Sequence, residues 1–149
     1  MHTFELFDIA EKNNIDIIYT SLPKTSCISM PYGNDEYCIG IDPDQITSLA
    51  DERVKLAHDI GHCVSGSFYN QHSPLDLRSK HEYRADKYGI KKLIPLDDLI
   101  FIMRKGYEAV WEIAEYFIVT EEFVRKALKI YENDLLEDKN KNDEFIGFI

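Results

Sequence analysis

Two histidines four residues apart are the first feature of the sequence that could carry chemistry. They are His58 and His62, in the segment His58-Asp59-Ile60-Gly61-His62. Residues four apart on a helix share one face, with Cβ atoms about 5–6 Å apart, so both imidazoles can reach one zinc ion at distances of about 2.0–2.1 Å. In the related HExxH pattern, the glutamate between the histidines acts as general base. Asp59 occupies that position here, and we predict a metal site with Asp59 as its base.

A third metal ligand is needed, because a catalytic zinc usually takes three protein ligands and leaves a fourth position open. The following predicted helix offers Glu82, and four residues later Asp86, on one helical face. Glu82 could bind the metal while Asp86 accepts a hydrogen bond from the distal nitrogen of a ligating histidine. Two alternatives stay open. Glu82 could instead close a capping box that begins at Ser79, and Asp86 could be a surface partner of Lys87 or Arg84.

Two long helices must position these side chains. The first is expected over 43–64, with Asp42 as N-cap, Pro43 at the first helical position and Gln45 completing a capping box. Its apolar residues recur at helical spacing and form one stripe: Ile46, Leu49, Ala50, Val54, Ala57, Ile60, Gly61 and Val64. The second helix is expected to begin at Ser73-Pro74 and to end near Ile94-Pro95.

The remaining elements predict an α+β fold. A short amphipathic helix over 3–14 precedes three short runs rich in branched and aromatic residues, at 15–19, 27–30 and 37–41. The last two runs read as a hairpin closed by Gly33-Asn34, in a small, mostly antiparallel three-stranded sheet. Shorter helices are expected near 96–105, 107–117 and 121–133, followed by a frayed polar segment.

Composition limits the class of protein. The 149 residues are 44% hydrophobic and 30% charged, as in an ordinary globular domain. A net charge of −10 argues against direct binding of nucleic acid through phosphate contacts. Three cysteines without metal-site spacing indicate free thiols in a reducing compartment. No secretory signal and no apolar run of about 20 residues is evident, so we expect a cytoplasmic protein without a membrane span.

Four segments together resemble the ImmA/IrrE metallopeptidase family: Leu56-Ala57-His58-Asp59-Ile60-Gly61-His62-Cys63, Gly66-Ser67-Phe68-Tyr69-Asn70, Lys80-His81-Glu82-Tyr83-Arg84-Ala85-Asp86-Lys87 and Leu93-Ile94-Pro95. The resemblance implies a minimal thermolysin-like (gluzincin) core over 1–95, a helical C-terminal element over 96–135 and a polar tail over 136–149. It also implies one zinc per chain, held by His58, His62 and Glu82. Many members are encoded beside a helix-turn-helix repressor on phages and mobile elements and cleave it, so such a repressor is the partner expected here.

Asp59 departs from the family pattern, which has glutamate at this position. Aspartate is one methylene shorter, so its carboxylate falls back by about 1.5 Å. A displacement of about 1 Å can cost on the order of 100-fold in rate, and we therefore expect slower turnover than glutamate would give. The alternative is a binding module with weak or no catalysis that sequesters a repressor. Tyr69 could serve as an oxyanion donor or could simply pack within its loop.

A second alternative is a DNA-binding regulator that uses residues 107–133. The segment 113–128 resembles a helix-turn-helix, in which two helices meet at a short turn. Its second helix begins with Glu121 and Glu122, however, and only three basic residues oppose them: Arg125, Lys126 and Lys129. We therefore expect this helix pair to pack on the core or to dock a protein partner.

Overall fold

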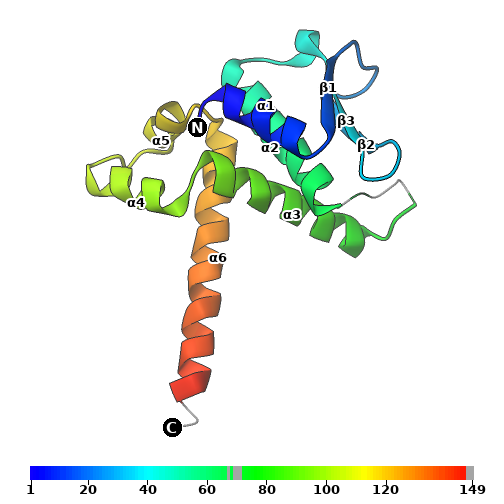
Figure 1. The fold of residues 1–149 in the computed structure, drawn as a ribbon. Helices are drawn as coiled ribbons and strands as arrows, with labels where there is room; N and C mark the ends of the chain where they lie inside the picture. The colour runs from blue at the N-terminus through cyan, green and yellow to red at the C-terminus, as the bar shows by residue number, and fades with distance from the viewer. Residues whose placement is uncertain (67, 69–71, 147–149) are drawn as a thin grey trace.

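The computed structural model describes residues 1–66, 68 and 72–146, and its α+β architecture confirms the predicted fold class (Figure 1). The elements follow in the order α1 (Thr3–Lys12), β1 (Ile15–Tyr19), β2 (Cys27–Pro31), β3 (Tyr37–Ile41), a 3-10 turn (Pro43–Gln45), α2 (Leu49–Ser65), α3 (Leu75–Leu93), α4 (Leu96–Arg104), α5 (Val110–Phe117) and α6 (Glu121–Ile146).

The sheet has the strand order β1-β3-β2. Strands β2 and β3 pair antiparallel, which confirms the predicted hairpin, but β1 and β3 pair parallel. The sheet is therefore mixed, and the expectation of a mostly antiparallel sheet was wrong on this pairing. The chain passes from β1 to the far edge before it returns through the middle as β3, so the first and last strands run the same way. This route leaves β2 at an edge of the sheet.

One face of the sheet carries the core. Alternate strand residues Ile15, Ile39 and Ile41 are buried, whereas Ile18 and Met30 on the opposite face are half exposed. Helices α1 and α2 cover the buried face, and both contribute apolar side chains to a single core cluster that includes Leu6, Ala10, Leu56, Ala57 and Ile60. The period-two pattern of the strands thus determines which side of the sheet receives the site helix.

Helix α2 begins later than the sequence predicted. Asp42 caps only the 3-10 turn, and Ser48 is the true N-cap, accepting a hydrogen bond from the backbone N–H of Asp51 at 3.0 Å. The predicted apolar stripe is not buried over its whole length, since the side chains of Leu49 and Val64, near its two ends, are 54% and 43% exposed. The sheet and α3 cover the middle of α2, so burial is confined to that part of the helix.

Asp42 nevertheless anchors the segment before α2. Its carboxylate accepts hydrogen bonds from the backbone N–H groups of Leu22 and Asp44 and from the Gln45 amide, at 2.9, 3.0 and 2.7 Å. These hydrogen bonds lower the pKa of Asp42, and the bond from the Leu22 backbone has the largest effect. A carboxyl group whose pKa is lowered by folding stabilises the protein above its unfolded pKa of about 3.9 and loses this contribution as the pH falls through the folded pKa.

We therefore expect Asp42→Asn to lower the free energy of unfolding at neutral pH, and the difference from the natural protein to shrink below about pH 4. Urea unfolding measured from pH 7 to pH 2 checks this. Asp44→Asn, at the neighbouring exposed carboxylate, controls for the removal of one charge. A stability difference that stays constant over the whole pH range would contradict the assignment.

A buried arginine fixes the N-terminal half of α2 to the rest of the fold. Arg53 donates hydrogen bonds to the backbone carbonyl oxygens of Ile118 and Phe117, at the end of α5, at 3.0 and 3.4 Å. It also binds the carbonyl of Met1 and the hydroxyl of Thr3, at 2.7 and 3.1 Å. A cation at the C-terminal end of a helix is favourable because the last carbonyls carry partial negative charge.

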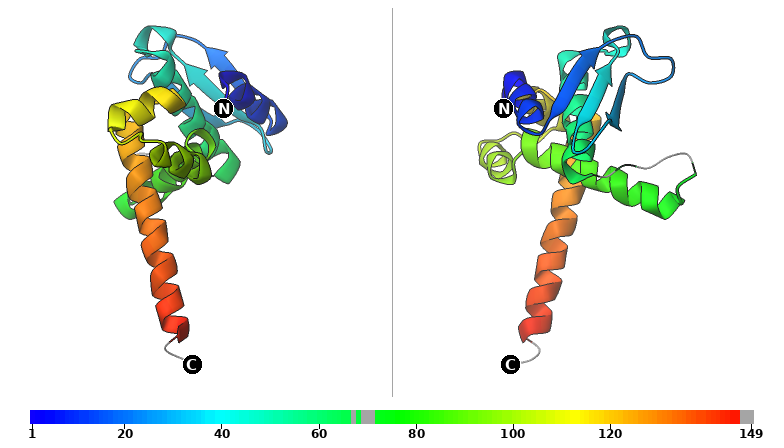
Figure 2. Two further views of the ribbon diagram at one scale, coloured as in Figure 1. Left: turned by 90° about the vertical axis from the view of Figure 1, so that its left-hand side faces the viewer. Right: turned by 45° about the vertical axis from the view of Figure 1, so that its right-hand side comes forward.

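Helix α6 is longer than predicted. It was expected to end near residue 133 but continues to Ile146, so most of the segment expected as a polar tail is helical. Its N-terminal half packs on the core through Phe123, Val124, Ala127 and Ile130. Its C-terminal half projects away from the other elements, as the three views agree (Figures 1 and 2). None of the described helices combines the length and apolar composition that a membrane span requires.

Candidate metal centre

The close crossing of α2 and α3 brings the two site helices together. Gly61 lies where a Cβ atom would approach the backbone oxygen of Ala85 to 2.9 Å and its Cα to 3.1 Å. The second contact point, Gly89 against Ala57, is looser, since an added Cβ would meet its nearest atoms at 3.5 Å. The glycine between the two histidines therefore sets how near α3 can bring its acidic side chains.

We expect Gly61→Ala to destabilise the fold by about 1–3 kcal/mol, the usual cost of overpacking, and to weaken metal binding by displacing α3. Gly89→Ala is the matched control. At this position the added methyl makes an ordinary contact, and the gain in helix propensity should leave stability unchanged or raised by up to about 1 kcal/mol. Urea unfolding and zinc titration of both variants check the prediction, which fails if they behave alike.

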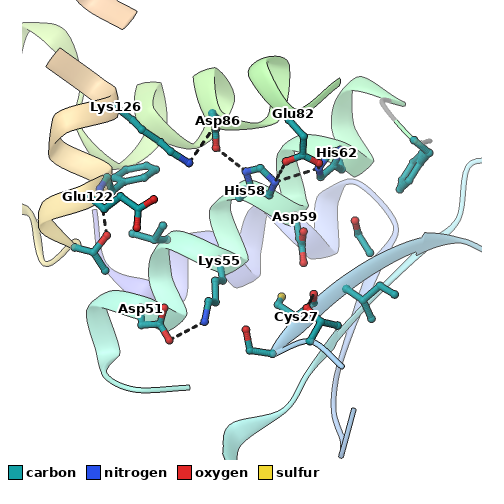
Figure 3. A pocket seen from close by; sticks show the side chains of 18 residues that line it. Cys27, Asp51, Lys55, His58, Asp59, His62, Glu82, Asp86, Glu122 and Lys126 are labelled. Atoms are coloured by element: carbon teal, nitrogen blue, oxygen red, sulfur yellow. Dashed lines mark hydrogen bonds and ion pairs between the residues drawn. The ribbon is translucent and has the colours of Figure 1, made fainter. Parts of the chain in front are cut away.

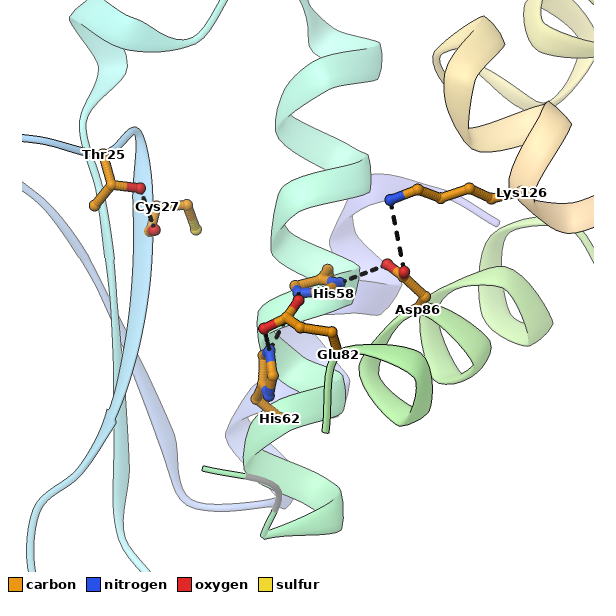
Figure 4. Close-up of polar contacts among 7 residues, drawn as sticks. All are labelled: Thr25, Cys27, His58, His62, Glu82, Asp86 and Lys126. Atoms are coloured by element: carbon orange, nitrogen blue, oxygen red, sulfur yellow. Dashed lines mark hydrogen bonds and ion pairs between the residues drawn. The ribbon is translucent and has the colours of Figure 1, made fainter. Parts of the chain in front are cut away.

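Three side chains converge at this crossing (Figure 4). His58 Nε2 lies 3.1 Å from His62 Nε2 and 3.0 Å from Glu82 Oε2, while His62 Nε2 lies 3.2 Å from Glu82 Oε1. The three ligand atoms all lie within 4.8 Å of one another. Among the described residues, these three side chains form the one group of three or more that could hold a metal ion. The structure thus brings together the three residues that the sequence predicted as ligands.

The donor set fits a zinc ion. Four ligands placed tetrahedrally at about 2.0–2.1 Å from a metal are separated from one another by about 3.3 Å, close to the separations found here. Two imidazole nitrogens and one carboxylate oxygen are a known set for a catalytic zinc with one open position. Glu82 occupies the middle of α3 (Leu75–Leu93), so the alternative of a capping box at a helix start is wrong.

Asp86 lies behind His58, on the side away from the cluster. Its Oδ1 is 2.9 Å from His58 Nδ1, and its Oδ2 is 3.5 Å from Lys126 Nζ. Burial favours the neutral forms of both partners, yet the hydrogen bond outweighs it, so the pKa of His58 is raised and the pKa of Asp86 is lowered. An acceptor at Nδ1 holds the Nδ1–H tautomer and turns Nε2 toward Glu82 and His62.

Asp59 lies on the opposite side of α2 from α3 and faces the sheet. It is only 8% exposed, and its Oδ2 has no hydrogen-bond partner among the described residues. Burial raises the pKa of this carboxyl, against the opposing hydrogen bond from Cys27 and the charges of the two histidines. A buried carboxylate oxygen without a partner is costly, and such atoms are typical of sites that await a ligand or a water molecule.

These residues line a cleft of about 700 Å³ (Figure 3). Its walls are α2 and α3 with the candidate metal ligands, the edge strand β2 from Cys27 to Ser29, and the first turns of α6. Phe68 also lines it, with its ring stacked on His62 at a centroid distance of 6.2 Å. A volume of this size lies within the range of ligand-binding clefts.

Three residues that line the cleft were not predicted as site residues. Cys27 was predicted as a free thiol at the start of a strand, Phe68 as part of a segment that resembles the family, and Lys126 as one of three basic residues on the second helix of the C-terminal pair. Helix α5 contacts α6, and Phe123 and Val124 of α6 are buried in the core. Tyr69 lies outside the described residues.

An α+β domain that presents two histidines from one helix and a glutamate from the next has the arrangement of a metallopeptidase. The comparison with family models agrees, since the peptidase M78 model, described as the IrrE N-terminal-like domain, matches residues 10–129. The chain therefore belongs to this family of metallopeptidase-type domains, which confirms the resemblance seen in the sequence. Among curated protein sequences, none matches the chain.

Proposed function

We propose that this protein is a zinc-dependent endopeptidase that cleaves a specific cytoplasmic protein, and that His58, His62 and Glu82 hold the zinc. The convergence of these three side chains to separations of 3.0–3.2 Å is the observation that supports the proposal most strongly. Membership of a peptidase family supports the reaction class. Bound there, zinc would polarise the scissile carbonyl and lower the pKa of water toward about 7.

Asp59 is proposed as the general base. It adjoins His58 in sequence, lines the same cleft, and keeps Oδ2 without a partner among the described residues. It would take a proton from the attacking water and pass it to the leaving amine. Asp86 would hold His58 in the tautomer that presents Nε2, because the 2.9 Å contact occupies Nδ1.

The edge strand β2 is proposed to bind the substrate backbone. Ser26 and Tyr32 form inward hydrogen bonds, to Asp42 and Glu36. Backbone groups alternate in direction along an antiparallel strand, so those of Cys27 and Ser29 point toward the free edge. An extended peptide could add there as a further strand, beside the candidate ligands. We therefore expect Ser29→Pro to reduce cleavage without reducing zinc content. Unchanged cleavage would count against binding of the substrate as an added strand.

The family resemblance suggests a helix-turn-helix repressor as substrate, with cleavage relieving repression in a phage or mobile-element setting. A peptidase in the cytoplasm must be narrowly specific, and a net charge of −10 suits a partner with a basic surface, as DNA-binding proteins have. The three free cysteines fit the reducing cytoplasm.

A second candidate is a repressor-binding module that retains the metal but has weak or no catalysis. The observation that favours it is the aspartate at position 59, whose side chain is one methylene shorter than that of glutamate. Both candidates share the metal site and the cleft, and they differ only in turnover.

The experiment that separates them uses an extract of the cells that carry the gene. The zinc-loaded protein is added, and newly formed protein N-termini are labelled and identified by mass spectrometry. Our proposal predicts one or very few new N-termini, within a helix-turn-helix protein, and none with His62→Ala. If the protein retains such a partner on an affinity column yet produces no new N-terminus, the binding-module candidate replaces the peptidase.

A further inference from the structure

A second groove, of about 400 Å³, lies where α5, the start of α6 and the first turn of α2 meet. We call it the α5 groove. Its apolar lining includes Ala50, Trp111 and Ile118, and two carboxylate side chains, Glu115 and Glu121, also line it. No described residue lines both this groove and the metal cleft. The α5 groove is therefore a separate concave surface, which the proposed metal chemistry does not use.

Two large apolar side chains in the α5 groove are exposed. Trp111 is 54% and Ile118 is 45% exposed. Single apolar residues on a flat surface are ordinary, but these two line a concavity together. Tryptophan is also enriched among the residues that anchor protein interfaces, because its ring removes a large apolar area from water when a partner covers it. The α5 groove thus has the features of a docking surface.

The backbone of Ile118 gives independent support. This C-cap residue of α5 has φ 54° and ψ 58°, in the left-handed region, where a β-branched residue is a genuine outlier. Glycine or asparagine is usual at such a helix end. Arg53 holds the conformation, since its Nε donates to the Ile118 carbonyl oxygen at 3.0 Å. Isoleucine adds strain here while only about half of its side chain is buried, and such strain is typical of functional sites.

The charge of the α5 groove indicates what occupies it. Glu115 and Glu121 are exposed, and none of the described residues that line the groove is basic. Arg125 contacts Glu121 at 3.2 Å, but an exposed ion pair of this kind contributes little and can be exchanged. A second copy on a two-fold axis would bring the same carboxylates face to face, and an anionic membrane would be repelled. The charge therefore favours a basic partner.

We propose that the α5 groove is a docking site for a protein segment that carries a large apolar side chain flanked by lysine or arginine, as on a basic amphipathic helix. The apolar side chain lies against Trp111 and Ile118, and the basic side chains contact Glu115 and Glu121. The site does not depend on the proposed peptidase function. Thr120 and Glu122, which alternate with groove residues at the start of α6, line the metal cleft, so a partner docked here lies beside that cleft.

Fluorescence tests the proposal directly, because Trp111 is the only tryptophan of the chain. The probe is an amphipathic helical peptide of leucine and lysine. We expect it to move the Trp111 emission to shorter wavelength in a saturable way, since the half-exposed indole leaves water. Peptides with glutamate in place of lysine, or with serine in place of leucine, should cause no shift. No shift with the leucine–lysine peptide, or an equal shift with the leucine–glutamate peptide, overturns the proposal.

Two further outcomes would identify another occupant and would also overturn the proposal. A shift caused by phosphatidylcholine vesicles without peptide would mean that the α5 groove binds lipid. A shift that appears when the concentration of the protein alone is raised would mean that it binds a second copy of the chain.

Ile118→Asn separates binding from folding. Asparagine adopts the left-handed conformation readily, so the urea midpoint, followed by circular dichroism, should not fall. Affinity for the leucine–lysine peptide should fall at least about 10-fold, because an apolar anchor is lost. If the midpoint does fall, the second groove variant decides. This is the double change Glu115→Gln and Glu121→Gln, which keeps both apolar side chains and should weaken binding about 3- to 10-fold and reduce its salt dependence.

The matched controls lie on the distal part of α6. Leu136→Asn and Glu137→Gln change exposed residues of the same kinds outside the α5 groove and should leave the peptide affinity unchanged. Natural affinity in both groove variants, or equal losses in the groove variants and the controls, overturns the proposal, whether or not the protein cleaves peptides.

Discussion

Replacing His62 with alanine is expected to abolish stoichiometric zinc binding. His62 is buried, and its Nε2 is one of the three converging ligand atoms, so its loss leaves two ligands around the metal. The effect should exceed the roughly 10–100-fold loss of affinity that follows removal of a partner behind a ligand. Metal content by mass spectrometry, on untagged protein purified without added metal, measures it.

Two further variants make this result specific. Asp86→Ala removes only the acceptor at His58 Nδ1, so it should retain about one zinc per chain at saturation with affinity lowered roughly 10–100-fold. His72→Ala removes an exposed histidine that is not part of the cluster and should change nothing. Equal zinc content in the natural protein and in His62→Ala would mean that the metal binds elsewhere.

Asp59→Glu should increase the rate of peptide-bond cleavage, by up to about 100-fold. The longer side chain moves the carboxylate forward by about 1.5 Å, and errors of about 1 Å in the placement of a catalytic group can cost this much. The cleft beside Asp59, at about 700 Å³, provides room for one methylene. The measurement is kcat on the identified bond, with zinc content determined in the same samples.

The companion variant is Asp59→Asn, which keeps the shape of the side chain and removes its basicity. It should lower kcat by about 10²–10⁴-fold while the zinc content remains that of the natural chain, because Asp59 is not among the converging ligands. Cleavage by the natural chain that equals or exceeds that of Asp59→Glu would show that the short carboxylate is already well placed.

The parts of the site that could be predicted were those fixed by local geometry. Two histidines four apart must share a helix face, and the same spacing places Glu82 above Asp86 on α3. The three strands were predicted almost to the residue, because branched and aromatic runs between turn formers are a local signal.

The errors came from competing local signals and from pairings between distant segments. Asp42 was predicted to cap the long helix, but it caps only the 3-10 turn, and Ser48 caps α2. The polar residues after 133 suggested fraying, yet helical propensity does not require burial, and α6 continues to Ile146. The parallel pairing of β1 with β3 likewise depends on the whole sheet.

The placement of Cys27 and Asp59 in one cleft could not be predicted from the sequence for the same reason. The two residues are far apart in the chain, and neither the thiol nor its neighbours match a motif. Lys126, which approaches Asp86 from α6, is a similar case. What the sequence does indicate is that a carboxylate lies between the histidines. Which side chains surround that carboxylate depends on how β2 packs on α2.

The measurement that tests the central claim most directly is the zinc-edge X-ray absorption spectrum of the zinc-loaded protein. If His58, His62 and Glu82 hold the metal, the first shell contains only nitrogen and oxygen at about 2.0–2.1 Å, with the outer scattering of two imidazoles. A sulfur shell at about 2.3 Å, or the absence of imidazole scattering, would contradict the account, because the metal would then be bound by a thiolate such as Cys27 or at another place in the molecule.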